Sequence, residues 1–312
     1  MSESKVIALC SRRFALPALQ QLAFFKQLAV VAIPEHCEAM IENTKNVLHG
    51  TGVPVILLQK KTFVKKITEA INVYAVDTGL MLSFSYKIPP SVYKLPVKGF
   101  YNVHPGMLPA YRGPDPIFQQ IRNKEKNAGV TLHKVDDDIN SGPIVVSEMI
   151  KLEPDDTYGI LNEKLSYTAA RLTGTLLKLL SFDINIPSRP QDESKAVYFK
   201  KQAAIDVSIN WRAMNAASII ALINACNPWN KGAVTQLNNK KIFVMEATFM
   251  DWPENPEQIP GTIISIDEKG LVVAALNNQV VCVQLIYTDV GFLLAKRLKQ
   301  FGVAPGARFG LV

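Results

Sequence analysis

Residues 6–9 read Val-Ile-Ala-Leu, a short apolar run that is followed by a helical pattern at residues 14–25. The alternation continues, with apolar runs at residues 28–33, 53–58, 80–84 and 99–103 and amphipathic stretches at residues 35–49 and 63–73. Strands that alternate with helices pair in parallel, because each crossover carries the chain back across the sheet. Continuously apolar strands favour a sheet that is covered on both faces. The sequence therefore predicts an α/β fold, with a Rossmann-like, doubly wound and mostly parallel sheet.

Two further apolar runs, at residues 130–135 and 144–149, extend the predicted sheet on either side of a polar turn at residues 136–142. A helix is predicted at residues 158–180, because leucines recur there at the spacing of one helical face. No GxGxxG motif follows the first strand, so the sequence gives little support to dinucleotide binding.

The polar, irregular stretch at residues 188–208 is interpreted as a linker between a domain of residues 1–187 and a domain of residues 209–312. The second domain opens with a predicted helix and continues with short strands at residues 234–237, 241–249, 261–266, 271–275 and 280–287. Short strands joined by polar turns predict a small β-barrel. A basic helix is predicted at residues 291–301.

The composition is that of a folded protein with more than one domain. The chain has 312 residues, of which 48% are hydrophobic and 20% charged. Its net charge of +7 would help it to meet a polyanion or a phosphate-bearing substrate. Ordinary soluble enzymes carry such an excess as well, and no dense run of Lys and Arg marks a nucleic-acid patch.

The cysteines indicate neither a zinc site nor a disulfide framework. Cys10, Cys37, Cys226 and Cys282 are far apart in sequence and form no CxxC pair. The apolar run near the N-terminus is too short for a signal segment or a membrane span. We therefore expect a cytoplasmic protein with free thiols and no membrane partner.

Residues 101–113 read Tyr-Asn-Val-His-Pro-Gly-Met-Leu-Pro-Ala-Tyr-Arg-Gly and begin where a predicted strand ends. Open α/β sheets bind their ligands outside the carboxyl ends of their strands. Asn102 and His104 are two residues apart on a strand, so their side chains point to the same side. An asparagine amide can donate to a developing oxyanion, and a histidine can carry a proton between two nitrogens. The pair therefore indicates a catalytic site.

This stretch, with its Asn-Val-His-Pro and Leu-Pro-Ala-Tyr-Arg-Gly motifs, resembles the signature of the folate-dependent formyltransferases. The resemblance covers nearly the whole chain, through short motifs at residues 129–133, 141–144, 209–211, 227–229, 260–263 and 305–306. It implies a Rossmann-like catalytic domain followed by an OB-like C-terminal barrel. It also implies transfer of a formyl group from 10-formyltetrahydrofolate, as co-substrate, to an amine, without a metal.

The catalytic set of this family is Asn, His and Asp. By resemblance, Asn102 stabilises the oxyanion of the tetrahedral intermediate and His104 is the proton shuttle. The position of the family's Asp, which orients the histidine and raises its pKa, is Asn140 in this chain. A neutral amide neither stabilises an imidazolium by Coulomb attraction nor accepts a proton in this pH range.

Three carboxylates just upstream of Asn140 would offer a substitute charge if the turn were rearranged; they are Asp136, Asp137 and Asp138. We favour the alternative of a solvated acidic turn, because neighbouring side chains diverge in extended or turn geometry. His133 is interpreted as a strand residue rather than as a second catalyst.

The resemblance places folate in a crevice between two loops, with contacts from Ser85, Tyr86, Lys87, Ile88, Asp136, Asp137, Asp138 and Ile139. Arg12 and Arg13 follow the first strand and are candidate contacts for an acidic or phosphorylated acceptor, with a solvated helix N-terminus as the alternative. Arg112 is interpreted as a loop anchor, a phosphate contact or a surface charge.

Three functions remain open at this point. The first is formylation of a small amine, such as a nucleotide-linked amino sugar. The second is formylation of methionyl-tRNA, which the short acidic segment at residues 34–42 disfavours because phosphates are repelled there. The third is a non-catalytic folate-binding protein, a reading that rests on Asn140.

Overall fold

The computed structural model describes residues 4–182, 186–251 and 258–311. The chain folds into two compact units. The first comprises Met1–Pro116, Asn127–Lys151 and Asn162–Phe199, and the second comprises Ile117–Lys126, Leu152–Leu161 and Lys200–Val312. The division into domains at residues 188–208 stays a prediction.

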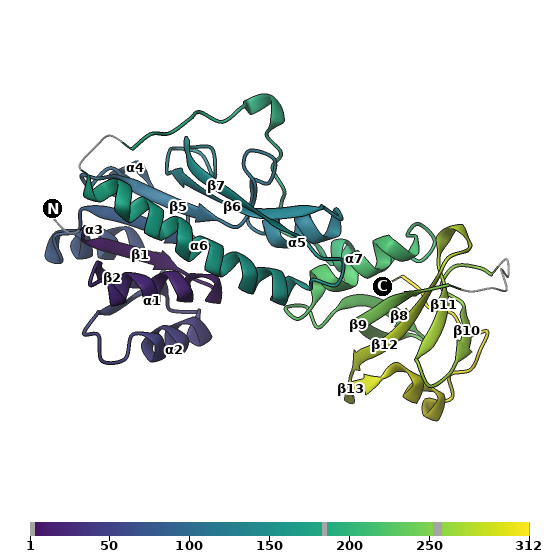
Figure 1. Cartoon of the computed structure of the whole chain (residues 1–312). Coiled ribbons are helices and arrows are strands. Elements are labelled where there is room, and N and C mark those ends of the chain that lie inside the picture. Colours follow the sequence, from purple (N-terminus) through teal and green to yellow (C-terminus); the bar gives the residue numbers. More distant parts are fainter. Residues whose placement is uncertain (1–3, 183–185, 252–257, 312) are drawn as a thin grey trace. The chain divides into compact units, whose positions relative to one another are not determined.

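The first unit is built on a seven-stranded sheet with the order β3-β2-β1-β4-β5-β6-β7 (Figure 1). Its strands are β1 (Val6–Cys10), β2 (Leu28–Pro34), β3 (Val55–Leu58), β4 (Thr78–Leu82), β5 (Phe100–His104), β6 (Asn127–Lys134) and β7 (Ile144–Lys151). The first five strands pair in parallel, whereas β6 pairs antiparallel with both β5 and β7. The predicted mostly parallel sheet is confirmed.

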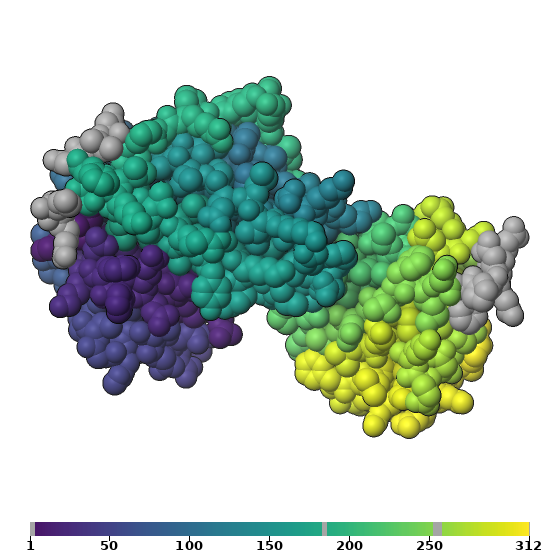
Figure 2. All heavy atoms as spheres, in the orientation of Figure 1, coloured from purple at the N-terminus to yellow at the C-terminus, as the bar shows by residue number. Residues whose placement is uncertain are grey.

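Helices cover both faces of this sheet, as the continuously apolar strands predict. All five residues of β1 are buried. On one face, Ile7 and Leu9 pack in a cluster with Ile67 and Ile71 of α3 (Phe63–Val73). The other helices of this unit are α1 (Leu16–Phe24), α2 (Glu38–Val47), α4 (Pro90–Tyr93) and most of α6 (Tyr158–Ser181). The helices α4 and α5 (Pro116–Arg122), the latter mostly in the second unit, were not predicted. Figure 2 shows the teal atoms of α6 at the surface of the first unit.

The strand order reverses between β1 and β4, and two serine-bearing loops meet there. The amide of Ser11, just after β1, donates to the carbonyl of Ser83, just after β4, at 3.1 Å. The Ser11 hydroxyl in turn accepts from the amide of Ser85 at 3.1 Å. A switch point of this kind leaves a crevice at the carboxyl edge of the sheet, where α/β folds bind ligands.

The second unit combines α7 (Ala216–Cys226) with an antiparallel sheet of the order β10-β11-β12-β9-β8, and β13 pairs with β12. Its strands are β8 (Ala233–Leu237), β9 (Lys240–Met250), β10 (Ile263–Ile266), β11 (Leu271–Ala274), β12 (Val280–Thr288) and β13 (Gly291–Leu294). The chain's last residues bridge the outer strands, because Gly310 pairs with Gln236 of β8 and Arg308 pairs with Thr262, next to β10. This closure produces the predicted OB-like barrel.

The helix predicted at residues 291–301 is only partly correct. Gly291–Leu294 form β13, with Leu294 opposite Leu285, and only Ala295–Phe301 form a helix, of the 3-10 type. Exposure alternates along β13, which is the period of a strand. Within the described ranges, no helix combines the length and apolarity that a membrane crossing requires.

Candidate functional site

The candidate site lies at the end of β5, where the sequence placed it. Asn102 and His104 are both buried on this strand. In the antiparallel ladder with β6, Asn102 lies opposite His133. Asn140, in the turn between β6 and β7, comes to the same place, and the structure therefore brings together all three residues of the predicted catalytic set together with His133.

The side-chain amide of Asn102 is the centre of this group. Its Nδ2 donates to Oδ1 of Asn140 at 3.1 Å and lies 3.0 Å from Nε2 of His133. An amide nitrogen carries two hydrogens, and these two contacts use both. Among the described residues, the oxyanion donor that the sequence predicts is therefore already paired.

Burial favours the neutral imidazole form of His104. Its Nε2 lies 2.7 Å from the carbonyl oxygen of Tyr111, which can only accept, so Nε2 carries the hydrogen. Nδ1 is then the basic nitrogen. Burial lowers the pKa of His104 to about 3, against a smaller rise from the Tyr111 hydrogen bond and a fall from His133.

His133 is the residue that the sequence interpretation undervalued. Its Nδ1 lies 2.8 Å from the carbonyl of Lys134, so Nδ1 carries the hydrogen and Nε2 accepts from Asn102. Burial lowers its pKa to about 4, while the Lys134 carbonyl, Asp136 and Asn140 raise it and Arg112 lowers it. Asp136 is thus the member of the acidic turn whose charge acts on the centre. The register of β5 and β6, which places His133 opposite Asn102, is what reveals this role.

The loop after β5 is held in place by the segment that follows α6. Arg112 donates to Gln191 at 2.9 Å through Nη2 and to Glu193 at 2.9 Å through Nη1, as a loop anchor does. Gln191 also donates to the carbonyls of Asn140 and Gly142, at 2.9 and 2.8 Å. Gln191, which the sequence did not single out, therefore joins the two loops that carry the centre. Contact between Arg112 and an acceptor stays a prediction.

Two backbone positions explain the motif around Asn140. Asn140 has φ 60, a left-handed conformation that Asn and Asp adopt more readily than other side chains. A Cβ added at Gly142 would lie 1.9 Å from the carbonyl oxygen of Lys134, so only glycine fits there. The turn thus requires its Gly, whereas position 140 accepts either the amide or the acid.

Of the predicted folate residues, the structure ties Ser85 to the switch point between β1 and β4, and Tyr86 follows it in the chain. Ser85 is tied to Ser11, and the Tyr86 ring contacts Phe63 and Phe84, with centroids 5.1 and 5.4 Å away. Ile88 is buried in a cluster against which Val135 packs. Lys87 and Ile139 are exposed.

The acidic turn is ordered by two hydrogen bonds. Asp136 accepts from the Ser141 hydroxyl at 2.7 Å, and Asp137 accepts from the Tyr93 hydroxyl at 2.7 Å. This bond to Asp137, with burial, raises the pKa of Tyr93 to about 12. Asp138 is exposed. Two of the three predicted carboxylates are therefore engaged at the turn rather than simply solvated.

Two loops predicted to contact folate have little backbone pairing. Within the described part of the chain, residues 86–88 and 136–139 make no backbone hydrogen bond. The apolar side chains of Ile88 and Val135 lie beside them. Open amides next to an apolar wall fit a planar ring that carries amide-like donors and acceptors, as the pteridine of a folate does.

The predicted acceptor contacts lie on the rim. Nη1 of Arg12 is 3.7 Å from Oδ1 of Asp115, which connects the loop after β1 with the loop after β5. Arg13 is exposed at the start of the 3-10 helix Arg13–Ala15. Neither arginine belongs to the buried centre.

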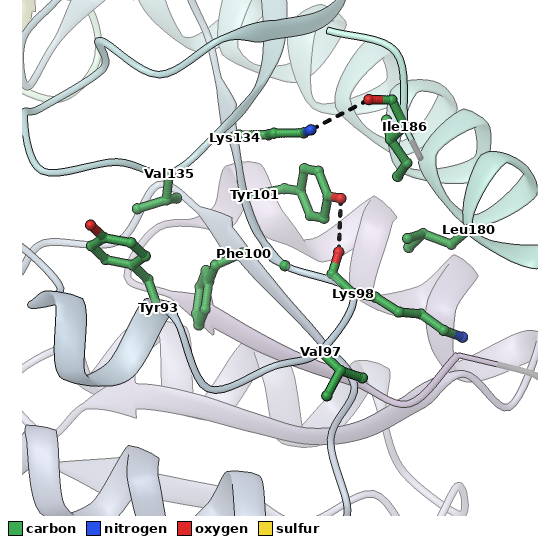
Figure 3. A pocket seen from close by; sticks show the side chains of 10 residues that line it. Tyr93, Val97, Lys98, Phe100, Tyr101, Lys134, Val135, Leu180 and Ile186 are labelled. Carbon is green, nitrogen blue, oxygen red and sulfur yellow. Dashed lines mark hydrogen bonds between the residues drawn. The ribbon is translucent and has the colours of Figure 1, made fainter. Parts of the chain in front are cut away.

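A cavity of about 490 Å³ lies at the other end of β5 (Figure 3). Phe100, Tyr101, Lys98 and Lys134 line it, and the Tyr101 hydroxyl donates to the carbonyl of Lys98 at 2.8 Å. None of the predicted site residues is among its lining residues, although Tyr93 connects it to Asp137. In the described residues, no group of three or more His, Cys, Asp or Glu side chains is placed to hold a metal ion.

Comparison with known proteins agrees with this geometry. Residues 25–173 match the formyl transferase family model, and residues 202–289 match its C-terminal domain model. A methionyl-tRNA formyltransferase from Dictyoglomus turgidum is 30% identical over 280 residues, covering 88% of both chains. The chain belongs to the formyl transferase family.

Two solved structures share the fold of this chain. An N-formyltransferase from Helicobacter canadensis, in complex with folinic acid and dTDP-3-aminofucose, matches with a TM-score of 0.66 at 17% identity, covering 90% of this chain and 98% of that one. HypX from Aquifex aeolicus, in complex with tetrahydrofolic acid, matches with a TM-score of 0.66 at 16% identity over 96% of this chain. This chain spans about half of HypX, 48%.

Proposed function

We propose that this formyltransferase moves the formyl group of 10-formyltetrahydrofolate to a primary amine. The observation that carries the proposal is the buried pair Asn102 and His104, on one side of β5 at its carboxyl end. Relatives named as formyltransferases, and fold neighbours solved with folates, support the same donor.

The proposed chemistry follows from the groups available. The amine nitrogen attacks the formyl carbon, and the carbonyl oxygen becomes an oxyanion that the Asn102 amide stabilises. The Nδ1 atom of His104 takes the proton that the attacking nitrogen gives up. The same proton is delivered to the leaving folate nitrogen as its bond to the formyl carbon breaks. Charge and atoms balance without a metal ion.

A small amine that carries an acidic group is the first candidate acceptor. Arg12 and Arg13 follow β1 at the rim of the crevice and suit a phosphate or carboxylate. Between β2 and α2 only Glu35, His36 and Cys37 intervene, so no long basic loop is available there for a tRNA arm. A nucleotide-linked amino sugar has both the amine and the phosphates.

Methionyl-tRNA is the second candidate acceptor, and the comparisons give no support to placing it lower. The curated relatives are named for it, whereas the fold neighbours include sugar N-formyltransferases. The barrel also presents a surface suited to RNA. Nζ of Lys231 lies 4.2 Å from the ring centroid of Tyr287, and Tyr287 contacts Phe292, which is 63% exposed. Cations among exposed aromatic rings are typical of surfaces that bind single-stranded nucleic acid.

The test is release of tetrahydrofolate from 10-formyltetrahydrofolate in the presence of a panel of amines. The panel contains nucleotide-linked amino sugars, small phosphorylated amines and charged initiator tRNA, and Asn140→Asp is assayed beside the wild type. We expect wild-type turnover with one acceptor class. Activity that appears only in Asn140→Asp would overturn the proposal and leave a folate-binding protein that has lost its chemistry.

A further inference from the structure

The further inference concerns His133, which deepens the proposed function and rests on it. His133 is buried and is the cross-strand neighbour of Asn102. Its ring is fixed by the Lys134 carbonyl, at 2.8 Å from Nδ1, and this bond leaves Nε2 with only its lone pair. A neutral His133 therefore accepts one amide hydrogen of Asn102 and cannot offer one in return.

The second hydrogen of Asn102 has a less firmly held partner. It goes to Oδ1 of Asn140 at 3.1 Å, and the Asn140 side chain also has a hydrogen bond with His133 and a long one, 3.4 Å, from Nδ2 to the Gly113 carbonyl. An oxyanion accepts more strongly than a neutral amide oxygen. The oxyanion would therefore take the place of Asn140, rather than of His133, as acceptor of an Asn102 hydrogen.

We propose that His133 is a positioning residue, which anchors one hydrogen of the Asn102 amide and thereby leaves the other, held by Asn140 in the absence of substrate, for the oxyanion of the reaction. His133 acts through Asn102 and touches no reacting atom. The carboxamide at position 140 belongs to the same arrangement, because it keeps a full negative charge away from Nε2 of His133.

The arrangement requires an uncharged His133 ring. A protonated Nε2 would meet the Nδ2 hydrogens of Asn102 and turn the amide over. The charged groups that face His133 are Asp136, which favours the proton, and Arg112, which opposes it; His104 lies on the neighbouring strand and is neutral as well. Burial outweighs Asp136 and leaves the pKa of His133 at about 4.

Three variants test the proposal by activity. His133→Leu removes the acceptor at similar volume, His133→Gln keeps an acceptor oxygen, and His49→Gln changes an exposed histidine as a control. With the acceptor found in the panel, we expect His133→Leu to lower kcat about 100-fold, the scale of a lost oxyanion donor, with the KM for folate nearly unchanged. The kcat of His133→Gln should be at least about tenfold higher than that of His133→Leu.

An NMR experiment tests the same proposal without turnover. With four histidines in the chain, labelled ring signals are assigned by single substitutions, and the exposed His36 and His49 are internal references. We expect the His133 ring to stay neutral down to about pH 5. The side-chain amide hydrogens of Asn102 should exchange slowly with solvent in the wild type and in His133→Gln, and rapidly in His133→Leu.

The outcomes separate the two proposals. Absence of wild-type turnover with every acceptor would sink the formyl-transfer proposal and leave the NMR result to decide on His133. Unchanged kcat in His133→Leu, or unchanged exchange of the Asn102 amide in that variant, would overturn the positioning role. So would protonation of the His133 ring near pH 6.5, the ordinary pKa of histidine.

Discussion

The buried centre at the end of β5 and the loops around it carry different kinds of side chain. Four buried side chains make up the centre and none of them is charged; they are Asn102, His104, His133 and Asn140. Charged side chains, including the buried Asp115, lie on the loops around it, and the structure pairs them in Arg12–Asp115, Arg112–Glu193, Ser141–Asp136 and Tyr93–Asp137.

The difference shows what the amide at position 140 does. A charge near water is screened and inexpensive, whereas a buried charge requires a partner. A carboxylate at position 140 would be such a charge, and the neighbouring imidazoles would take up a proton to balance it. With Asn140 the centre stays neutral and is organised by hydrogen-bond direction alone.

Apart from loss of His104, the largest expected effect is loss of the amide at the centre. Asn102→Ala should lower kcat about 10²–10³-fold, because it removes the donor to the oxyanion. The exposed Asn46→Ala on α2 is the matched control and should leave kcat unchanged. Steady-state kinetics with the identified acceptor measure the effect, and a fall in kcat of less than twofold would contradict the assignment of the centre.

Asn140→Asp turns the centre into a charged one and is the next test. The left-handed backbone at position 140 accepts Asp, so the fold should hold. We expect the pKa values of His133 and His104 to rise by about 1–3 units, because a carboxylate favours the imidazolium. Titration of the labelled histidine signals measures this; unchanged values would show that residue 140 does not control charge at the centre.

The loss of folding stability in acid should depend on the same two buried histidines. The ordinary pKa of histidine is 6.5, and burial lowers it to about 3 for His104 and about 4 for His133. Between pH 6.5 and these values only the unfolded chain binds the protons, so stability is complete above pH 6.5 and is lost as the pH falls. Each histidine contributes about 1.4 kcal/mol per pH unit in its window.

Urea unfolding between pH 7 and pH 4 measures that slope, with His133→Gln expected to reduce it and His49→Gln to leave it unchanged. Equal slopes for His133→Gln and wild type would mean that His133 is already protonated in the folded protein.

The smallest effect is expected at the rim. Arg112→Ala removes charge-assisted hydrogen bonds to Gln191 and Glu193 and should lower the free energy of unfolding by about 1–3 kcal/mol. Glu193→Gln keeps a hydrogen-bond acceptor at an exposed position and should cost less. Chemical denaturation compares the two variants, and an equal loss would argue against Arg112 as the anchor of the loop.

Local patterns predicted most of this fold. Apolar runs and helical spacing identified all seven strands of the first sheet, and Asn-x-His at the end of a strand identified the pair on β5. The role of His133 was missed, because it depends on the antiparallel register that places it opposite Asn102. Gln191 was missed for a similar reason: it reaches Arg112 from 79 residues away. Such contacts follow from the folded topology and leave no local pattern.

The most direct test of the account is tetrahydrofolate release by the wild type and by His104→Ala, with His49→Ala as the control. The account predicts turnover by the wild type and by His49→Ala, and a loss of about 10²–10⁴-fold in His104→Ala, because the proton shuttle is gone. Full activity in His104→Ala would contradict it.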